Sequence, residues 1–251
     1  MFAEQRIELI KNILWSEGKV SISRLCDEIK VSDVTVRKDL DVLEKRGFLK
    51  KVHGGAVLTQ KSGSTDYLEG EDKYESICQL ATSMIHEHES VYIGPGLAGI
   101  ALARKITKDM HLSVITNNLE VVANLKSKVE SLYCLGGAVY RIGDTHFMHS
   151  SAKDTGIDEF AIGQAFIGCD GFDIHAGFTT RSRELAIDIQ QRRDSFSKVN
   201  IIVLPDDYGI ISLHKICQMT DITTIITGKN VPDELKEFCY SNNIPLYLAF
   251  D

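Results

Sequence analysis

Apolar residues recur at helical spacing in three stretches near the start of the chain. The first stretch covers residues 5–15. The second begins after Ser21 and the third after Ser32, and serine is a favourable residue for capping the start of a helix. Residues 30–31 separate the last two stretches and supply the turn. The pattern therefore predicts three helices, of which the second and third form a helix-turn-helix.

A β-prone stretch with a glycine pair follows at residues 48–57. A short strand, two glycines and a second short strand are typical of a two-stranded hairpin. Residues 59–72 are polar and include two glycines, a composition expected of a connection between domains.

Beyond this connection, apolar runs of strand length alternate with amphipathic stretches of helical period. Such alternation is typical of a largely parallel sheet with helices on both faces, so an α/β domain is predicted. The expected strands are 91–93, 112–115, 131–135, 164–167, 199–204, 223–226 and 246–248, and the expected helices are 74–85, 98–106, 119–126, 183–196 and 233–239. The predicted division is residues 1–58 for the small domain, 59–73 for the linker and 74–251 for the larger domain, and a chain of 251 residues suits two domains.

Charge is distributed unevenly along the chain. Residues 1–61 hold 12 Lys and Arg against 9 Asp and Glu, whereas the remainder holds 16 against 26, and the net charge is −7. An acidic body repels a polyanion, so only the N-terminal part can meet phosphate.

The six cysteines show no Cys-x-x-Cys spacing, which suggests neither a zinc site nor a disulfide framework. No apolar run approaches the roughly 18 residues of a membrane span, and no basic leader precedes an apolar core. We expect a cytoplasmic protein that is neither exported nor embedded in a membrane, and we expect no cofactor.

The third helix and the hairpin carry side chains suited to DNA. Threonine, arginine and lysine near a helix start can reach base edges and phosphates while the apolar side stays packed. Basic residues on the hairpin can lie along the backbone or in the minor groove. A three-helix bundle with a solvated basic face is the alternative. The predicted contacts to double-stranded DNA are Ser21, Ser32, Val34, Thr35, Arg37, Lys38, Lys50, Lys51, His53 and Gly54.

Residues 31–40, Val-Ser-Asp-Val-Thr-Val-Arg-Lys-Asp-Leu, together with Leu43-Glu44 and with Val-His-Gly-Gly-Ala at 52–56, resemble the DNA-binding signature of the DeoR family. The resemblance implies a winged helix-turn-helix and extends over essentially the whole chain. The larger domain is similar to the sensor domain of that family, which has the ribose-5-phosphate isomerase and CoA-transferase fold and commonly responds to phosphorylated sugars. It implies a DNA-binding transcriptional regulator, expected to repress carbohydrate-metabolism genes under the control of a sugar phosphate or a related metabolite.

Several loops at the expected strand ends carry glycine or small polar residues. In a parallel sheet ligands collect at this edge, where free amides and helix dipoles point. Turns that need positive φ explain most of the glycines one by one, but six such loops favour a ligand site. The resemblance to the family extends to four motifs in these loops. They are the Thr-Asn, the Gly-Gly with a trailing Arg, the Asp-Gly, and the Thr pair with a following Glu. The predicted effector contacts are Gly94, Gly96, Leu97, Ala98, Gly99, Thr116, Asn117, Gly136, Gly137, Arg141, Asp170, Gly171, Thr179, Thr180, Glu184 and Asp206.

Two loops depart from the family pattern. Gly94 stands where the family has Asp, and Leu97-Ala98 replace threonines, so hydroxyl donors to a phosphate are missing. The late loop keeps Asp206 but has Tyr208-Gly209 in place of Ser-Lys. Backbone amides of residues 96–99 can still hold an anion, with charge from Arg141, Arg181 or Arg183. We expect an effector that is less anionic or differently posed than the usual sugar phosphates.

An isomerase-like or transferase-like enzyme with a DNA-binding head is the main alternative function. Catalysis needs a positioned base or nucleophile with a partner, and no such constellation emerges from the spacing. A metal site is the second alternative. His86 and His88 fall in a predicted turn, and His146 and His149 are one turn apart if their segment is helical, but solvated surface histidines are the expected account of both pairs.

A homodimer or homotetramer would place two DNA-binding domains on repeated half-sites. Effector binding would then shift the population of arrangements in which both domains reach DNA together. Relief of repression is expected, and activation stays an alternative because the residues do not fix where the operator lies.

Overall fold

The computed structural model describes residues 6–7, 9–11, 13–14, 18–45, 49–52, 54–58, 73–143, 145–150 and 156–250. The chain divides into two compact units, Met1–Leu68 and Glu69–Asp251. Each unit is described by itself. Among the described residues, no helix is both long and apolar enough to cross a membrane.

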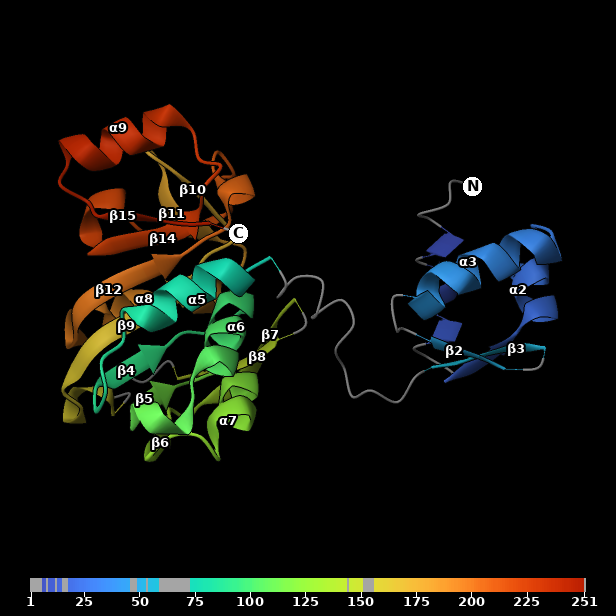
Figure 1. Cartoon of the computed structure of the whole chain (residues 1–251), viewed down its shortest axis with the longest axis horizontal. Helices are drawn as coiled ribbons and strands as arrows, with labels where there is room; N and C mark the ends of the chain where they lie inside the picture. The colour runs from blue at the N-terminus through green and yellow to red at the C-terminus, as the bar shows by residue number, and fades with distance from the viewer. Residues whose placement is uncertain are drawn as a thin grey trace. The chain divides into compact units, whose positions relative to one another are not determined.

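The N-terminal unit is a helix-turn-helix with a small antiparallel sheet (Figure 1). The described residues between 6 and 14 are helical, and the rest of the predicted first helix, 5–15, lies outside the described residues. Its elements are β1 (Lys19–Ser21), α2 (Ile22–Ile29), α3 (Asp33–Lys45), β2 (Leu49–Val52) and β3 (Gly55–Leu58).

The predicted caps of α2 and α3 are confirmed. The Ser21 hydroxyl accepts a hydrogen bond from the Arg24 amide at 3.3 Å, and the Ser32 hydroxyl accepts one from the Thr35 amide at 3.4 Å. Lys30 makes the turn in the left-handed region, with φ 58°. The apolar faces of the helices pack into one core with the sheet, because Leu25, Val36, Leu40, Leu43 and Leu49 are all buried.

The hairpin prediction needs one correction. The sheet has three strands in the order β1-β3-β2, not two. β1 is three residues long and buries only Val20, which is too short a pattern for sequence periodicity to reveal.

The larger unit is built on a seven-stranded parallel sheet in the order β15-β14-β12-β9-β4-β5-β6. All seven predicted strands are confirmed as the strands of this sheet. Their bounds are β4 (Ser90–Ile93), β5 (Ser113–Thr116), β6 (Ser131–Cys134), β9 (Ile162–Gly168), β12 (Phe196–Ile202), β14 (Thr224–Gly228) and β15 (Leu246–Ala249).

Five helices cover the sheet, as predicted (Figure 1). Apolar residues of α8 and α9 join one core cluster with alternate strand residues such as Tyr92 and Ile201. α5 and α6 pack against each other and against the strands. The helices are α5 (Glu75–Ser83), α6 (Leu97–Lys105), α7 (Leu119–Leu125), α8 (Arg183–Arg192) and α9 (Asp233–Ser241), with 3-10 turns η1 (Lys108–Met110), η2 (Ile157–Glu159), η3 (Arg193–Ser195), η4 (Pro205–Asp207) and η5 (Met219–Asp221).

Two antiparallel additions were not predicted. One is the hairpin of β7 (Ala138–Ile142) and β8 (Thr145–His149), and the other is a three-stranded sheet of β10 (Gly171–Asp173), β11 (Gly177–Thr180) and β13 (His214–Cys217). Both follow the carboxyl ends of strands of the main sheet, so they carry several of the predicted effector residues.

Candidate functional site

The outward side of α3 presents the side chains predicted to contact DNA. Val34 is 64% exposed and Lys38 is exposed, whereas Thr35 is half-buried with its hydroxyl 3.0 Å from that of Ser32. The Arg37 guanidinium pairs with the carboxylate of Asp33 one turn earlier, with Nη2 3.3 Å from Oδ2. This exposed pair raises the pKa of Arg37, and its partner can be exchanged for a base or a phosphate because both side chains reach solvent.

The hairpin contributes cations of two kinds. Lys50 and Lys38 are exposed, and their ammonium groups have no hydrogen bond or ion pair to any residue that the structure describes. Lys51 instead pairs with Asp41 on α3, which raises the pKa of its ammonium, and its amide donates to Glu44 at 2.7 Å. Gly54 turns the hairpin with φ 79°.

The predicted contact His53 lies outside the described residues. The remaining predicted DNA residues lie on α3, at the starts of α2 and α3, and on the hairpin. Their contacts with DNA stay predictions.

α3 also makes an ion pair with the helical segment near the N-terminus. Arg6 donates to both carboxylate oxygens of Asp39, at 2.8 and 3.1 Å, and the two side chains are largely buried. A bidentate pair of this kind fixes the rotation of a helix as well as its position. No local spacing in the sequence singled out either residue.

In the larger unit, the loop after β4 is shaped by close backbone contact. A Cβ at Gly99 would lie 2.0 Å from the Gly94 carbonyl oxygen, so only glycine lets the first turn of α6 fold back on this loop. Gly96 caps α6 with φ 103°, and Leu97 and Ala98 form its first turn. The helix start therefore abuts the carboxyl edge of the sheet.

Thr116 and Asn117 use their side chains inside the protein. The Thr116 hydroxyl donates to the Ile93 carbonyl at 2.7 Å, and both residues are fully buried. The Asn117 amide nitrogen donates to the Met148 carbonyl at 2.9 Å, and its oxygen accepts from the Tyr92 hydroxyl at 2.9 Å. Their side chains thus hold β4, β5 and β8 together, and contact with an effector stays a prediction.

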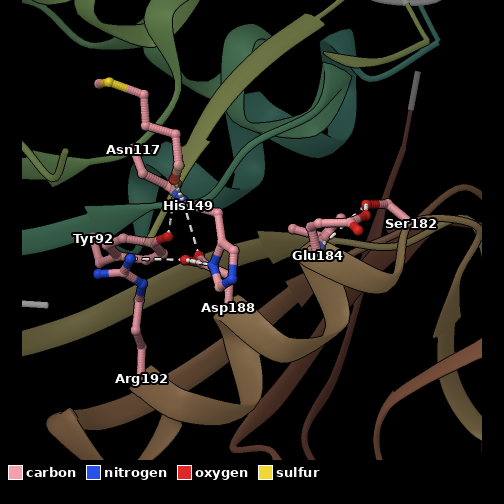
Figure 2. Close-up of polar contacts among 9 residues, drawn as sticks. Tyr92, Asn117, His149, Ser182, Glu184, Asp188 and Arg192 are labelled. Atoms are coloured by element: carbon pink, nitrogen blue, oxygen red, sulfur yellow. Dashed lines mark hydrogen bonds and ion pairs between the residues drawn. The ribbon is translucent and has the colours of Figure 1, made fainter. Parts of the chain in front are cut away.

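Asn117 is also part of a buried polar network (Figure 2). The carboxylate of Asp188, on α8, accepts from Asn117 at 2.8 Å and from Arg192 at 2.7 Å, and lies 3.1 Å from Nδ1 of His149. Asp188 and Arg192 are 0% and 1% exposed. Figure 2 shows these side chains and Tyr92 converging from different elements, so the network links α8 to β4, to the loop after β5 and to the end of β8.

The interpretation of His146 and His149 as solvated surface histidines is wrong for His149. Their segment is strand β8, in which His149 points inward and is 6% exposed. His146 points outward and lies 2.8 Å from Glu120. Within the described residues, no three histidine, cysteine, aspartate or glutamate side chains are grouped to hold a metal ion.

The Gly-Gly loop packs against the same strand. Gly137 has φ 148°, and a Cβ there would lie 2.3 Å from the His149 carbonyl oxygen, whereas nothing lies within 4 Å of a Cβ at Gly136. Arg141 is exposed on β7 and donates to the Gly143 carbonyl at 2.6 Å. The loop position is thus fixed by Gly137, and Gly136 is exposed.

The Asp-Gly and Thr-Thr pairs are brought together by the β10–β11 hairpin. The Asp170 carboxylate accepts from the Thr180 hydroxyl at 2.7 Å and from the Arg181 amide at 2.8 Å. The Thr179 hydroxyl donates to the Gly171 carbonyl at 3.0 Å. These side chains stabilise the hairpin and are already hydrogen-bonded.

Glu184 lies on the first turn of α8. Ser182 caps this helix, and its hydroxyl donates to the Glu184 carboxylate at 3.3 Å. Figure 2 shows Ser182 and Glu184 at the start of the helix, away from the buried network. Arg181 and Arg183 are exposed, and their guanidinium groups have no partner among the described residues. This loop therefore offers cations as well as a carboxylate.

The late loop forms the turn η4. Asp206 is exposed, while Asp207 is half-buried and accepts from the Leu204 amide at 3.3 Å. Burial, together with the charges of Asp170 and Asp206, raises the pKa of Asp207 above its ordinary value. Tyr208 donates to Glu234 at 3.0 Å. The carboxyl ends of β9, β12 and β14 are thus rich in negative charge.

The structure therefore brings the predicted effector residues to one edge of the sheet in two groups. One group surrounds β4, β9 and β12, and the other surrounds β5, β6 and the β7–β8 hairpin. The sequence interpretation missed Asp188 and Arg192, although a signal existed. Both lie on the same helical face as Leu185 and Ile189, and charged residues on an apolar face indicate a buried pair.

Two family models match the chain. Residues 6–62 match the DeoR-like helix-turn-helix domain, and residues 70–229 match the DeoR C terminal sensor domain. The chain is 30% identical over 233 residues to an uncharacterized HTH-type transcriptional regulator, FruR, of Bacillus subtilis (strain 168), covering 90% of this chain and 92% of that one. It is also 30% identical over 248 residues to the lactose phosphotransferase system repressor of Lactococcus lactis subsp. lactis, covering 95% and 96%.

Two solved structures are similar to the model. A probable sor operon regulator from Shigella flexneri matches with a TM-score of 0.41 and 14% identity, covering 76% of this chain and 95% of that one. Ribose 5-phosphate isomerase A from Methanocaldococcus jannaschii matches with a TM-score of 0.41 and 12% identity, covering 55% of each chain. Because both scores lie below 0.5, the description of the fold rests on the strand order and not on these likenesses. The two family models together span both units, and the chain therefore belongs to the DeoR family of DNA-binding transcriptional regulators.

Proposed function

We propose that the protein represses carbohydrate-metabolism genes by binding an operator through α3 and the β2–β3 hairpin, and that a sugar phosphate or related metabolite relieves this repression. The observation that carries the proposal is the outward side of α3, where Arg37 and Lys38 have no packing role. Arginine donates bidentately to guanine, and lysine neutralises phosphate.

The names of two relatives support the sugar-linked role. One is the lactose phosphotransferase system repressor of Lactococcus lactis, and another, 24% identical over 243 residues, is a putative aga operon transcriptional repressor of Escherichia coli O157:H7. The DeoR C terminal sensor domain matched by residues 70–229 supports a small-molecule effector.

The effector is proposed to lie at the carboxyl edge of the sheet, against the loops that begin at Gly94, Gly136 and Asp170. Several predicted contacts there have their side chains engaged within the protein, so backbone amides and the exposed arginines are the groups left to meet a ligand. The negative charge around Asp207 supports an effector that is less anionic, or whose phosphate is differently posed, than in the family pattern.

We further propose that the larger unit binds this ligand without catalysing its conversion to a product. The late loop has Tyr208-Gly209 and so lacks its lysine, the obvious candidate for a base or nucleophile. Catalysis needs such a group positioned with a partner. Turnover of pentose or hexose phosphates by the purified protein would contradict this proposal.

A cytoplasmic homodimer or homotetramer is part of the proposal, because two DNA-binding units on repeated half-sites multiply affinity. The test is titration of a protein–operator complex, followed by fluorescence anisotropy, with a panel of sugar phosphates. At least one member should dissociate the complex. Persistence of the complex against the whole panel would contradict the proposed effector class.

A further inference from the structure

Tyr74 is a buried side chain whose hydroxyl is unused. The residue is 6% exposed and immediately precedes α5, yet its hydroxyl has no hydrogen-bond partner among the described residues. The ring is buried, and the hydroxyl is a donor that no described residue takes up.

The position of Tyr74 is fixed by the helix that follows. Its carbonyl accepts the Cys78 amide at 2.7 Å, so the two side chains lie on one helical face, four residues apart. The Cys78 thiol donates to the Ala98 carbonyl at 3.6 Å. The first turns of α5 and α6 therefore lie against each other.

Ala98 in turn touches the end of β9, since a Cβ at Gly168 would lie 3.1 Å from its side chain. The far end of α5 lies at the opposite edge of the sheet, where Gln164 at the start of β9 donates to the Met84 carbonyl at 3.0 Å. The start of α5 therefore lies at the carboxyl edge of the sheet, beside the loops of the proposed effector site (Figure 1).

The charges at this place agree with the geometry. The pKa of Tyr74 is raised by burial and then by the nearby negative charge of Asp207, with a smaller contribution from Asp170. Lys73, which is exposed and has no ion pair among the described residues, lowers the pKa of Asp207. Its ammonium is thus a cation near the late loop, which has Tyr208-Gly209 where its family has Ser-Lys.

We propose that Tyr74 and Lys73 are effector-binding residues, the Tyr74 hydroxyl donating a hydrogen bond to the sugar and the Lys73 ammonium pairing with the phosphate. The inference rests on the proposed function and deepens it by naming two residues that no sequence motif indicated. Lysine in this place supplies a cation near the late loop, which lacks the lysine of the family pattern.

The assignment has a regulatory consequence. Lys73 and Tyr74 directly follow the predicted linker to the DNA-binding unit. A ligand held by Lys73 and Tyr74 contacts residues of the larger unit where the predicted linker ends, and we infer that binding free energy spent there biases the DNA-binding arrangement.

The experiment compares the full-length wild type with Tyr74→Phe and Lys73→Gln. The probes are ribose 5-phosphate, fructose 6-phosphate, the corresponding free sugars and inorganic phosphate, and binding is measured by calorimetry and by release of operator DNA. Tyr240→Phe and Lys236→Gln, exposed on α9, are the matched controls. Thermal unfolding checks that each variant folds.

Tyr74→Phe is expected to weaken the binding of phosphorylated and free sugars alike, roughly five- to tenfold, because one neutral hydrogen bond is lost. Lys73→Gln is expected to weaken only the binding of the phosphorylated probes, roughly tenfold or more. Both variants should bind operator as the wild type does when no probe is present, and the controls should match the wild type throughout.

Wild-type affinity for the probes in both folded variants would overturn the inference and leave the proposed function standing. If the wild type itself responds to none of the probes, the proposed effector class fails, and the inference falls with it.

Discussion

Arg37 and Lys38 are adjacent on α3 but differ in their partners within the protein. Arg37 pairs with Asp33 on the same helix, whereas Lys38 has no partner among the described residues. A guanidinium must exchange its carboxylate for a base edge, and the exchange is favourable because the guanine edge accepts two hydrogen bonds. Lys38 needs no such exchange and suits a phosphate. We therefore propose that Arg37 supplies discrimination between bases and that Lys38 supplies general affinity for DNA.

Replacement of Arg37 by alanine is expected to weaken operator binding by about 1–3 kcal/mol and to relax the base preference at one position. The reason is the loss of a bidentate contact to a base edge. Gel-shift titrations with the operator and with point-changed duplexes measure both effects. Lys236→Ala, on an exposed helix of the larger unit, is the control. Unchanged affinity for the Arg37 variant would refute the assignment.

Asp207 gives a prediction for stability. Burial and the neighbouring carboxylates raise its pKa in the folded protein, so the folded state holds a proton that the unfolded state has released between the ordinary and the raised pKa. Stability must therefore fall as pH rises through this window. Asp207→Asn, which keeps an oxygen for the Leu204 amide, should be more stable than the wild type at pH 7.

The gain should shrink as the pH is lowered toward the ordinary pKa of aspartate, about 3.9. Urea unfolding across this range measures the difference between variant and wild type. Asp194→Asn is the control, because that side chain is 92% exposed. A gain that is equal at all pH values would mean that ionisation of Asp207 is not the cause.

At the scale of elements, predictability follows from how each element is buried. The seven strands of the parallel sheet could be predicted because strands covered on both faces are nearly continuous apolar runs, as in Ile201-Ile202-Val203. The β7–β8 hairpin could not, since β7 (Ala-Val-Tyr-Arg-Ile) is mostly exposed and its sequence shows no regular alternation of apolar and polar residues. Nor could the partners of Asn117, which lie 25 to 71 residues away along the chain.

The Asp188 network is expected to hold α8 on the sheet. Asp188→Ala leaves Arg192 and His149 buried without their carboxylate, so a loss of about 3–5 kcal/mol in the free energy of unfolding is expected. Urea unfolding followed by circular dichroism measures this loss. Asp194→Ala on the next turn should stay within about 0.5 kcal/mol of the wild type. A similarly small effect at Asp188 would show that the network contributes little.

Two glycines of the effector loops form a matched pair. Gly99→Ala places a Cβ 2.0 Å from a backbone oxygen, whereas Gly136→Ala meets nothing within 4 Å. The first should cost about 1–3 kcal/mol of stability as the loop is displaced, and the second should be tolerated. Thermal unfolding of both variants separates them. Equal stability would mean that the loop before α6 is not held by this close contact.

At the scale of the whole molecule, charge separates the two units. The basic N-terminal part suits DNA, and the acidic remainder repels it, so the affinity of the chain for a duplex must come from a small part of its surface. In the proposed homo-oligomer, the effector acts by changing how two such parts reach DNA together. Thr35, Arg37 and Lys38 could be predicted as DNA contacts from the sequence because the start of a recognition helix follows from local spacing, and these contacts stay predictions. The effector site could be predicted only as a set of loops, since the proposed contact Tyr74 is brought to them by folding.

The most direct test of the account is sequencing of the duplexes that the purified full-length protein retains from a random pool. The account predicts enrichment of one recurring sequence with repeated half-sites, dependent on Arg37 and lost when an effective sugar phosphate is added. Retention of no sequence above the starting pool, even at low ionic strength, would contradict it.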